Sequence, residues 1–146
     1  MKRISLILIM GPAIAMFSCQ NLEQKENNSA INKEVSSQSE QENILYKEVM
    51  AIHDEVMPLM GDLMAMNKKI KSQDSTSQEA TELSIYLEEA NESMMNWMRK
   101  FNPNIENMTH EETMNYLEEE KKKIMQVREK MLSGHDKASA FLEAEQ

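Results

Sequence analysis

The chain of 146 residues has one cysteine, three glycines, three prolines and only 5% aromatic side chains. Because a disulfide needs two cysteines, any folded domain must be stabilised by packing alone. Three glycines are too few and too scattered for a glycine-rich phosphate-binding loop. With Cys19 near the N-terminus, the rest of the chain has no cysteine nucleophile.

The three histidines lack the neighbours that metal-dependent enzymes place around them. No His-Glu-x-x-His zinc motif is present. Di-iron bundles need a glutamate three residues before an inward-facing histidine, whereas the histidines here follow Met50, Asn107 and Leu132 at that spacing. We therefore expect no enzymatic activity.

Basic residues are also in short supply. Lysine and arginine number 16 against 25 aspartates and glutamates, which gives a formal net charge of −9. A surface this acidic repels phosphates and anionic lipid headgroups. The composition therefore excludes nucleic acid as a partner and excludes electrostatic docking to a membrane.

The first 18 residues have the pattern of a secretion signal. Lys2 and Arg3 precede an apolar segment, residues 4–17, that is too short to span a bilayer as a stable helix. We expect residues 1–18 to be a lipoprotein signal peptide that is removed on export.

Ser18 and Cys19 resemble the lipobox of bacterial lipoproteins, in which a small residue precedes the lipid-modified cysteine. Phe17 departs from this pattern because it is bulkier than the residue usually found there. The resemblance implies a Cys19 that carries lipid, palmitate included, and anchors the protein to a bacterial membrane in the cell envelope, outside the cytoplasm. The alternatives are ordinary cleavage nearby or an uncleaved anchor, with Cys19 unmodified in either case.

Residues 20–42 are dominated by Gln, Asn, Ser, Glu and Lys. Few of their side chains are apolar, and burying so few does not offset the entropy lost on ordering the segment. We expect residues 19–42 to be a lipidated cysteine and a flexible polar tether, and residues 43–146 to be the folded domain.

From Asn43 onward, apolar residues recur at spacings of four and three, as on one face of a helix. The members of this stripe are Leu45, Val49, Ile52, Val56, Leu59, Leu63, Met66 and Ile70. A second stripe beside it consists of Met50, His53, Met57, Met60 and Met64, so the expected buried face is wide. Pro58 lies inside the pattern and predicts a kink, or alternatively a break.

Two further helices follow from the same spacing. One begins after a turn, where Thr76 and Glu79 have the spacing of a capping box, and it ends at residues 102–104. The other begins at Thr109, with Glu112 as its capping partner. We expect it to fray or bend at Gly134.

No segment has the two-residue alternation of a strand. Helices joined by short connections lie antiparallel, and a heptad-like, coiled-coil-type period favours shallow crossing angles. The sequence therefore predicts an all-α fold, an up-down-up antiparallel three-helix bundle after a disordered N-terminal tether.

The segments at residues 49–66 and 94–101 resemble a group of short helical bacterial lipoproteins that are often labelled viral A-type inclusion protein. The most specific parts are the string from His53 to Gly61 and the methionine-rich segment around Trp97. The resemblance implies a helical fold and a cell-envelope location. It implies no activity and no functional residues.

Methionine is abundant: 15 occur in the chain, and 12 of them follow Cys19. Thioether sulfur and imidazole nitrogen are ligands that suit Cu(I) or Ag(I) outside the cytoplasm, and an indole face can cover such a metal. The candidate ligand set is His53, Met57, Met60, Met94, Met98 and Trp97.

Methionine also fills gaps in cores that have few aromatic side chains, and this explanation needs no metal. A third reading is a methionine-lined surface that accepts a helix of a partner protein or a second copy of the chain. The sequence favours a structural or protein-interaction module, with soft-metal binding as the alternative.

Overall fold

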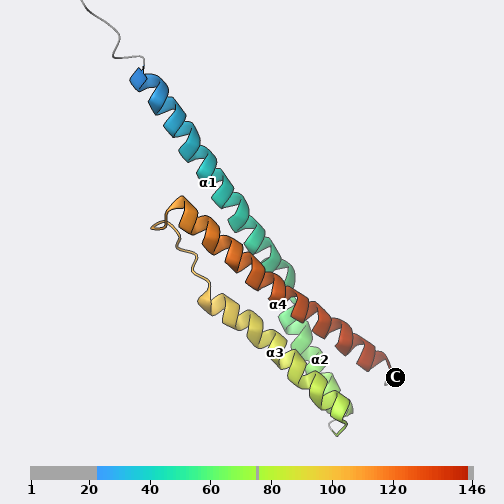
Figure 1. The fold of residues 1–146 in the computed structure, drawn as a ribbon. Helices are drawn as coiled ribbons and strands as arrows, with labels where there is room; N and C mark the ends of the chain where they lie inside the picture. The colour runs from blue at the N-terminus through green and yellow to red at the C-terminus, as the bar shows by residue number, and fades with distance from the viewer. Residues whose placement is uncertain (1–22, 75, 145–146) are drawn as a thin grey trace, which may run out of the picture. The chain divides into compact units, whose positions relative to one another are not determined.

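The computed structural model describes residues 23–74 and 76–144, which form four helices (Figure 1). These are α1 (Glu23–Val56), α2 (Leu59–Gln73), α3 (Gln78–Lys100) and α4 (His110–Ala144). No strand occurs among the described residues. The all-helical fold predicted from the sequence is therefore confirmed.

Helix α1 begins earlier than expected. Residues 23–42, expected to be a flexible tether, lie in α1 together with the start of the expected domain. The segment from Glu23 to Val56 contains neither glycine nor proline, and extending an existing helix costs far less than starting one. Cys19 and the signal segment lie outside the described residues.

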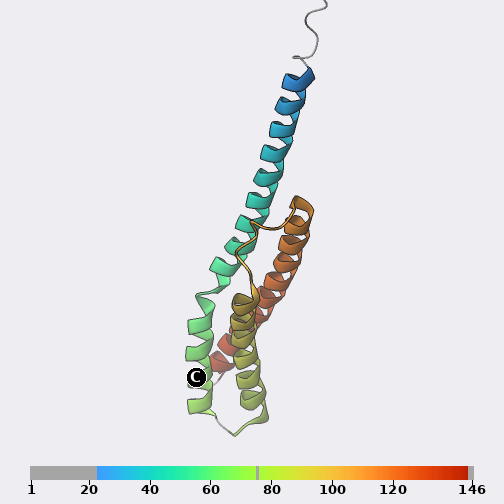
Figure 2. The same ribbon diagram turned by 90° about the vertical axis from the view of Figure 1, so that its left-hand side faces the viewer.

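The chain divides into two compact units, Met1–Val35 and Ser36–Gln146. In the first unit, the described residues are the N-terminal part of α1. In the second unit, α2, α3 and α4 pack against one another in all three pairings (Figures 1 and 2). All packing described below lies within the second unit, which begins seven residues before the expected domain boundary at Asn43.

Pro58 separates α1 from α2, so the structure has a break where a kink was the first expectation (Figure 2). Proline has no amide hydrogen and cannot donate to the carbonyl of Asp54, as a helical residue at that position would. Tight-turn hydrogen bonds take over, from Met60 N to Met57 O (3.2 Å) and from Gly61 N to Pro58 O (3.2 Å).

Every seventh residue of the first expected stripe is fully buried: Val49, Val56, Leu63 and Ile70 have no exposed surface. The seven-residue spacing of these buried side chains continues unchanged across the break at Pro58. The other apolar residues of the core that are at most 2% exposed are Ala80, Leu87, Ala90, Met94, Leu117, Ile124, Met131 and Ala138. None of the described helices combines the length and the apolar character that a membrane-spanning segment requires.

The second expected stripe is only partly buried. Met60 packs against the core, whereas Met57 is 48% exposed and Met64 is 64% exposed. The expectation of a wide buried face is therefore wrong. Two neighbouring helices, α3 and α4, cover one face of α2, and no further helix among the described residues covers the other.

The turn between α2 and α3 is organised by Asp74. Its Oδ1 accepts hydrogen bonds from the backbone N of Thr76 (2.9 Å) and of Ser77 (2.9 Å). The Ser77 side chain, followed by these two backbone groups, holds the pKa of Asp74 well below its usual range. The N-cap of α3 is Ser77, whose Oγ accepts from Ala80 N (3.1 Å). The expected capping box of Thr76 and Glu79 is therefore wrong, because Asp74 binds the Thr76 hydroxyl instead.

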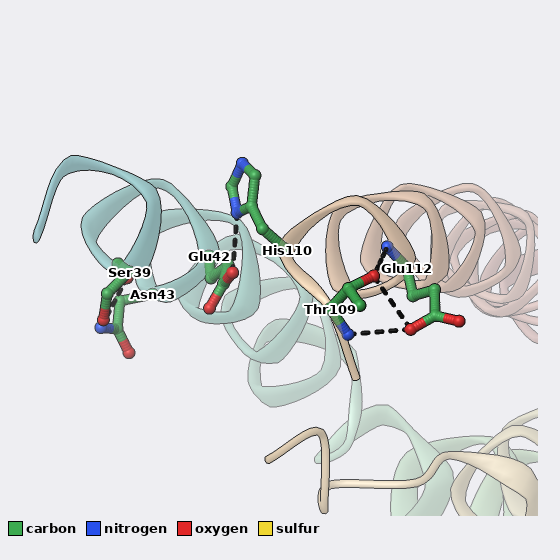
Figure 3. Close-up of polar contacts among 6 residues, drawn as sticks. All are labelled: Ser39, Glu42, Asn43, Thr109, His110 and Glu112. Carbon is green, nitrogen blue, oxygen red and sulfur yellow. Dashed lines mark hydrogen bonds and ion pairs between the residues drawn. The ribbon is translucent and has the colours of Figure 1, made fainter. Parts of the chain in front are cut away.

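The start of α4 matches its prediction (Figure 3). Glu112 Oε2 accepts from Thr109 N (2.8 Å) and Thr109 Oγ1 (2.9 Å), and Glu112 N donates back to Thr109 Oγ1 (3.3 Å). This is the reciprocal capping box that the sequence predicts. The same bonds lower the pKa of Glu112.

Ion pairs join α1 to α4 along their exposed edges. Lys121 Nζ lies 2.7 Å from Glu48 Oε2, and Arg128 donates two hydrogen bonds to Glu55 (2.8 and 2.6 Å). The Arg128 guanidinium lowers the pKa of Glu55. Exposed pairs of this kind are screened by solvent and contribute little to stability, so they orient the two helices more than they stabilise them.

Candidate functional site

His53 lies on α1 and faces α3. Its ring centroid lies 5.6 Å from that of Trp97, with 34° between the ring planes. His53 Nδ1 lies 2.8 Å from Asp54 Oδ1, so Nε2 is the ring nitrogen left for a ligand. Two members of the expected metal-binding set, His53 and Trp97, are thus brought together.

The four methionines of that set occupy different environments. Met94 has no exposed surface and belongs to the core, while Met57 is 48% exposed. Met60 and Met98 are partly buried against the core. Burial therefore separates Met57 from Met94, and a metal that used Met94 would have to lie within the core.

Around Trp97 the structure assembles an aromatic cluster, defined here as Tyr46, Trp97, Phe101 and Tyr116. Trp97 stacks on Phe101 with ring centroids 4.8 Å apart, and Phe101 lies 6.1 Å from both Tyr46 and Tyr116. Burial raises the pKa of Tyr116, whose hydroxyl oxygen accepts from Asn102 N (2.7 Å). The aromatic cluster joins α1, the end of α3 and α4.

Sequence reasoning singled out the segment of residues 94–101 around Trp97 but did not predict its contacts with the two tyrosines of the aromatic cluster. Tyr46 lies 55 positions before Phe101 and Tyr116 lies 15 positions after it, and no local pattern predicts these ring contacts. The Trp97 indole nitrogen, Nε1, is buried and has no hydrogen-bond partner among the described residues. Trp97 is therefore held by ring contacts and packing.

A second contact that the sequence did not reveal joins Glu42 to His110. His110 Nδ1 lies 2.7 Å from Glu42 Oε1, and both side chains are about one-quarter to one-third exposed (Figure 3). Glu42 was assigned to the tether, so its role in contacting the start of α4 was not expected. On the same stretch of α1, Asn43 Nδ2 donates to Ser39 O (2.8 Å).

One carboxylate is buried within the domain. Glu120 is 5% exposed, and Lys123 Nζ lies 2.8 Å from its Oε1. This contact raises the pKa of Lys123. No group of three or more His, Cys, Asp or Glu side chains that could hold a metal ion occurs in the described part of the chain.

The side chains that distinguish this domain are thus His53 facing Trp97, the exposed methionines of the second stripe, and the buried carboxylate of Glu120 with its exposed partner Lys123. Comparisons with protein-family models, with curated proteins and with solved structures gave no match to this chain.

Proposed function

We propose that the protein is a lipid-anchored module of the bacterial cell envelope that serves a structural or protein-interaction role and has no catalytic activity. The lipobox-type pair of Ser18 and Cys19 supports the anchor. The membrane partner is reached through the lipid on Cys19, since the acidic surface repels anionic headgroups.

The observation that carries the interaction role is the set of large apolar side chains left exposed on the helices. Met64 is 64% exposed, the highest value among the large apolar side chains. Methionine side chains are flexible and polarizable, and they adapt to varied partner surfaces. The partner is a helical protein or a second copy of this chain. The exposed large apolar side chains among the described residues of the second unit are Ile44, Met57, Met64, Ile85, Met95 and Met125.

We further propose that the domain is an up-down-up bundle, with α1 and α2 together as its first segment. The contacts of Glu48 with Lys121 and of Glu55 with Arg128 advance by seven residues on both helices, which is expected when α1 and α4 run in the same direction. The short connection between α2 and α3 supports an antiparallel pairing of those two helices.

Cys19→Ser tests the anchor. The variant is expected to lose all incorporation of an alkyne-labelled fatty acid and to leave the membrane fraction, because a serine oxygen does not receive the thioether-linked lipid. Metabolic labelling followed by fractionation of the cells measures both. Incorporation by the variant equal to that of the wild type would show that Cys19 is not the attachment site.

The same strains test the interaction surface. A photo-crosslinking amino acid in place of Met64 is expected to give a discrete adduct in the membrane fraction of cells whose protein keeps Cys19. The matched position is Lys69, which is also exposed on α2 but lies on another side of the helix, five positions from Met64, and no such adduct is expected there. Identical adducts at both positions, or none at Met64, would contradict a specific surface there.

Soft-metal binding is the second candidate, and the contact of His53 with Trp97 favours it. Trp97 is the only tryptophan of the chain, so the tryptophan emission comes from this side chain alone. If Cu(I) binds at His53, Met57, Met60, Met94, Met98 and Trp97, titration against a chromogenic chelator is expected to show one equivalent bound and quenched Trp97 emission.

His53→Ala is expected to weaken Cu(I) binding at least tenfold if imidazole is a ligand. His135→Ala is the matched control, since His135 is a partly exposed histidine that lies on α4 and outside the candidate ligand set. Wild-type protein that fails to compete with the chelator, or an equal effect of the two variants, would exclude the metal site and leave the interaction module.

A further inference from the structure

A pocket of about 390 Å³ lies between α3 and α4, and its lining is cationic. Lys100 from α3 and Lys123 and Lys130 from α4 line it, with Glu120 as the one acidic residue of the lining. This concentration of positive charge stands out in a chain with a formal net charge of −9. The pocket therefore favours an anion in a protein whose surface otherwise repels one.

The polar residues form two rows. On α3, Asn96 and Lys100 are four positions apart, and on α4, Lys123, Gln126 and Lys130 follow at spacings of three and four. Such spacings place side chains on one side of a helix. The row on α4 extends over about 10 Å, at a rise of about 1.5 Å per residue.

Trp97 and Val127 also line the pocket and provide its apolar part. Both are almost completely buried, at 6% and 8% exposure, so they belong to the fixed core of the domain. The pocket thus offers apolar surface beside the two polar rows.

Two of the three lysines have carboxylate partners. Lys123 Nζ lies 2.8 Å from Glu120, and Lys130 Nζ lies 3.0 Å from Glu89. Each of these ammonium groups has further hydrogens to donate. Lys100 is exposed and has no ion-pair partner among the described residues. Its position in the last turn of α3 also places a cation near the carbonyl end of the helix dipole.

The amides add neutral donors. Asn96 Oδ1 accepts from Arg99 Nη2 (2.8 Å), so the Asn96 amide nitrogen is the group left to donate. Gln126 contributes a second amide from the opposite row. The Ser93 hydroxyl, by contrast, donates to Glu89 O (2.7 Å) and presents only an acceptor.

We propose that this pocket binds a small anion that carries two or more phosphate or carboxylate groups. Lys100 meets one charged group and Lys130 another, while Lys123 remains paired with Glu120 and donates its remaining hydrogens. Several linked anionic groups match this arrangement because the lysines that line the pocket come from both rows. This ligand site is separate from the exposed methionines of the interaction surface.

Binding of inorganic triphosphate to the purified full chain in non-ionic detergent tests the site. Titration is followed by Trp97 emission, because Trp97 lines the pocket, and by calorimetry. Saturable one-to-one binding is expected. The double variant Lys100→Gln with Lys130→Gln is expected to bind at least tenfold more weakly, with unchanged circular dichroism.

The matched control is Lys68→Gln with Lys69→Gln, which removes the same charge from exposed positions on α2. Equal weakening in the two double variants would mean that only overall charge matters, and it would overturn the proposal, as would a wild-type chain that binds neither triphosphate nor citrate. Binding of citrate that depends on Lys100 and Lys130 would assign the pocket to carboxylates as well as phosphates.

Discussion

Leu87→Ala is expected to lower the free energy of unfolding by about 2–5 kcal/mol, the range for truncating a buried leucine. Leu87 is 1% exposed on α3 and lies against α4 at Gly134. A Cβ added at Gly134 would lie only 3.1 Å from Leu87 Cδ2, so little space is available for the surroundings to relax. Urea denaturation followed by circular dichroism of the helices measures the loss.

Ile85→Ala is the matched control, since it truncates a similar side chain two positions earlier on the same helix. Ile85 is 51% exposed, and its truncation is expected to change the free energy of unfolding by no more than about 0.5 kcal/mol. Equal losses in the two variants would contradict the packing of α3 against α4 through Leu87.

Gly134 shows why some features of this fold could not be predicted. In isolation, a glycine late in a helical pattern predicts fraying or a bend, yet α4 continues through Gly134 to Ala144. The reason lies on α3, where Tyr86 and Leu87 occupy the space that a side chain at Gly134 would need. A local pattern contains no information about a neighbour that is 47 positions away.

The helical stripes were predictable because one periodic face must be buried. Val49, Val56, Leu63 and Ile70 follow that face through the break at Pro58. How wide the buried face is depends on how many helices surround it, and the sequence of one helix does not state this number. Hence Met64, in the second stripe, was expected to be buried and is exposed.

The residues of the candidate site were predicted from the sequence, but how deeply each of them is buried was not. The sequence placed His53 and Trp97 in one set, and the structure has their rings in contact. It could not distinguish the fully buried Met94 from the half-exposed Met57, because both belong to apolar stripes. The contact of Glu42 with His110 could not be predicted either, since it joins residues 68 positions apart in the sequence.

Trp97→Ala is expected to lower the free energy of unfolding by about 3–5 kcal/mol, because it removes the largest buried ring of the aromatic cluster. Trp97 stacks on Phe101, lies beside His53 and is 6% exposed. Removing the indole takes away contacts on α1 and α3 together. Urea denaturation followed by circular dichroism is the measurement, since the variant has no tryptophan emission.

Trp97→Phe separates the ring contacts from the indole N–H. Because Nε1 has no hydrogen-bond partner, phenylalanine removes a buried unsatisfied donor and keeps an aromatic face against Phe101. The expected loss is about 1–2 kcal/mol, from the smaller ring volume alone. A loss as large as that of Trp97→Ala would mean that the indole nitrogen makes a strong hydrogen bond, and that ring packing is not what holds Trp97 between α1 and α4.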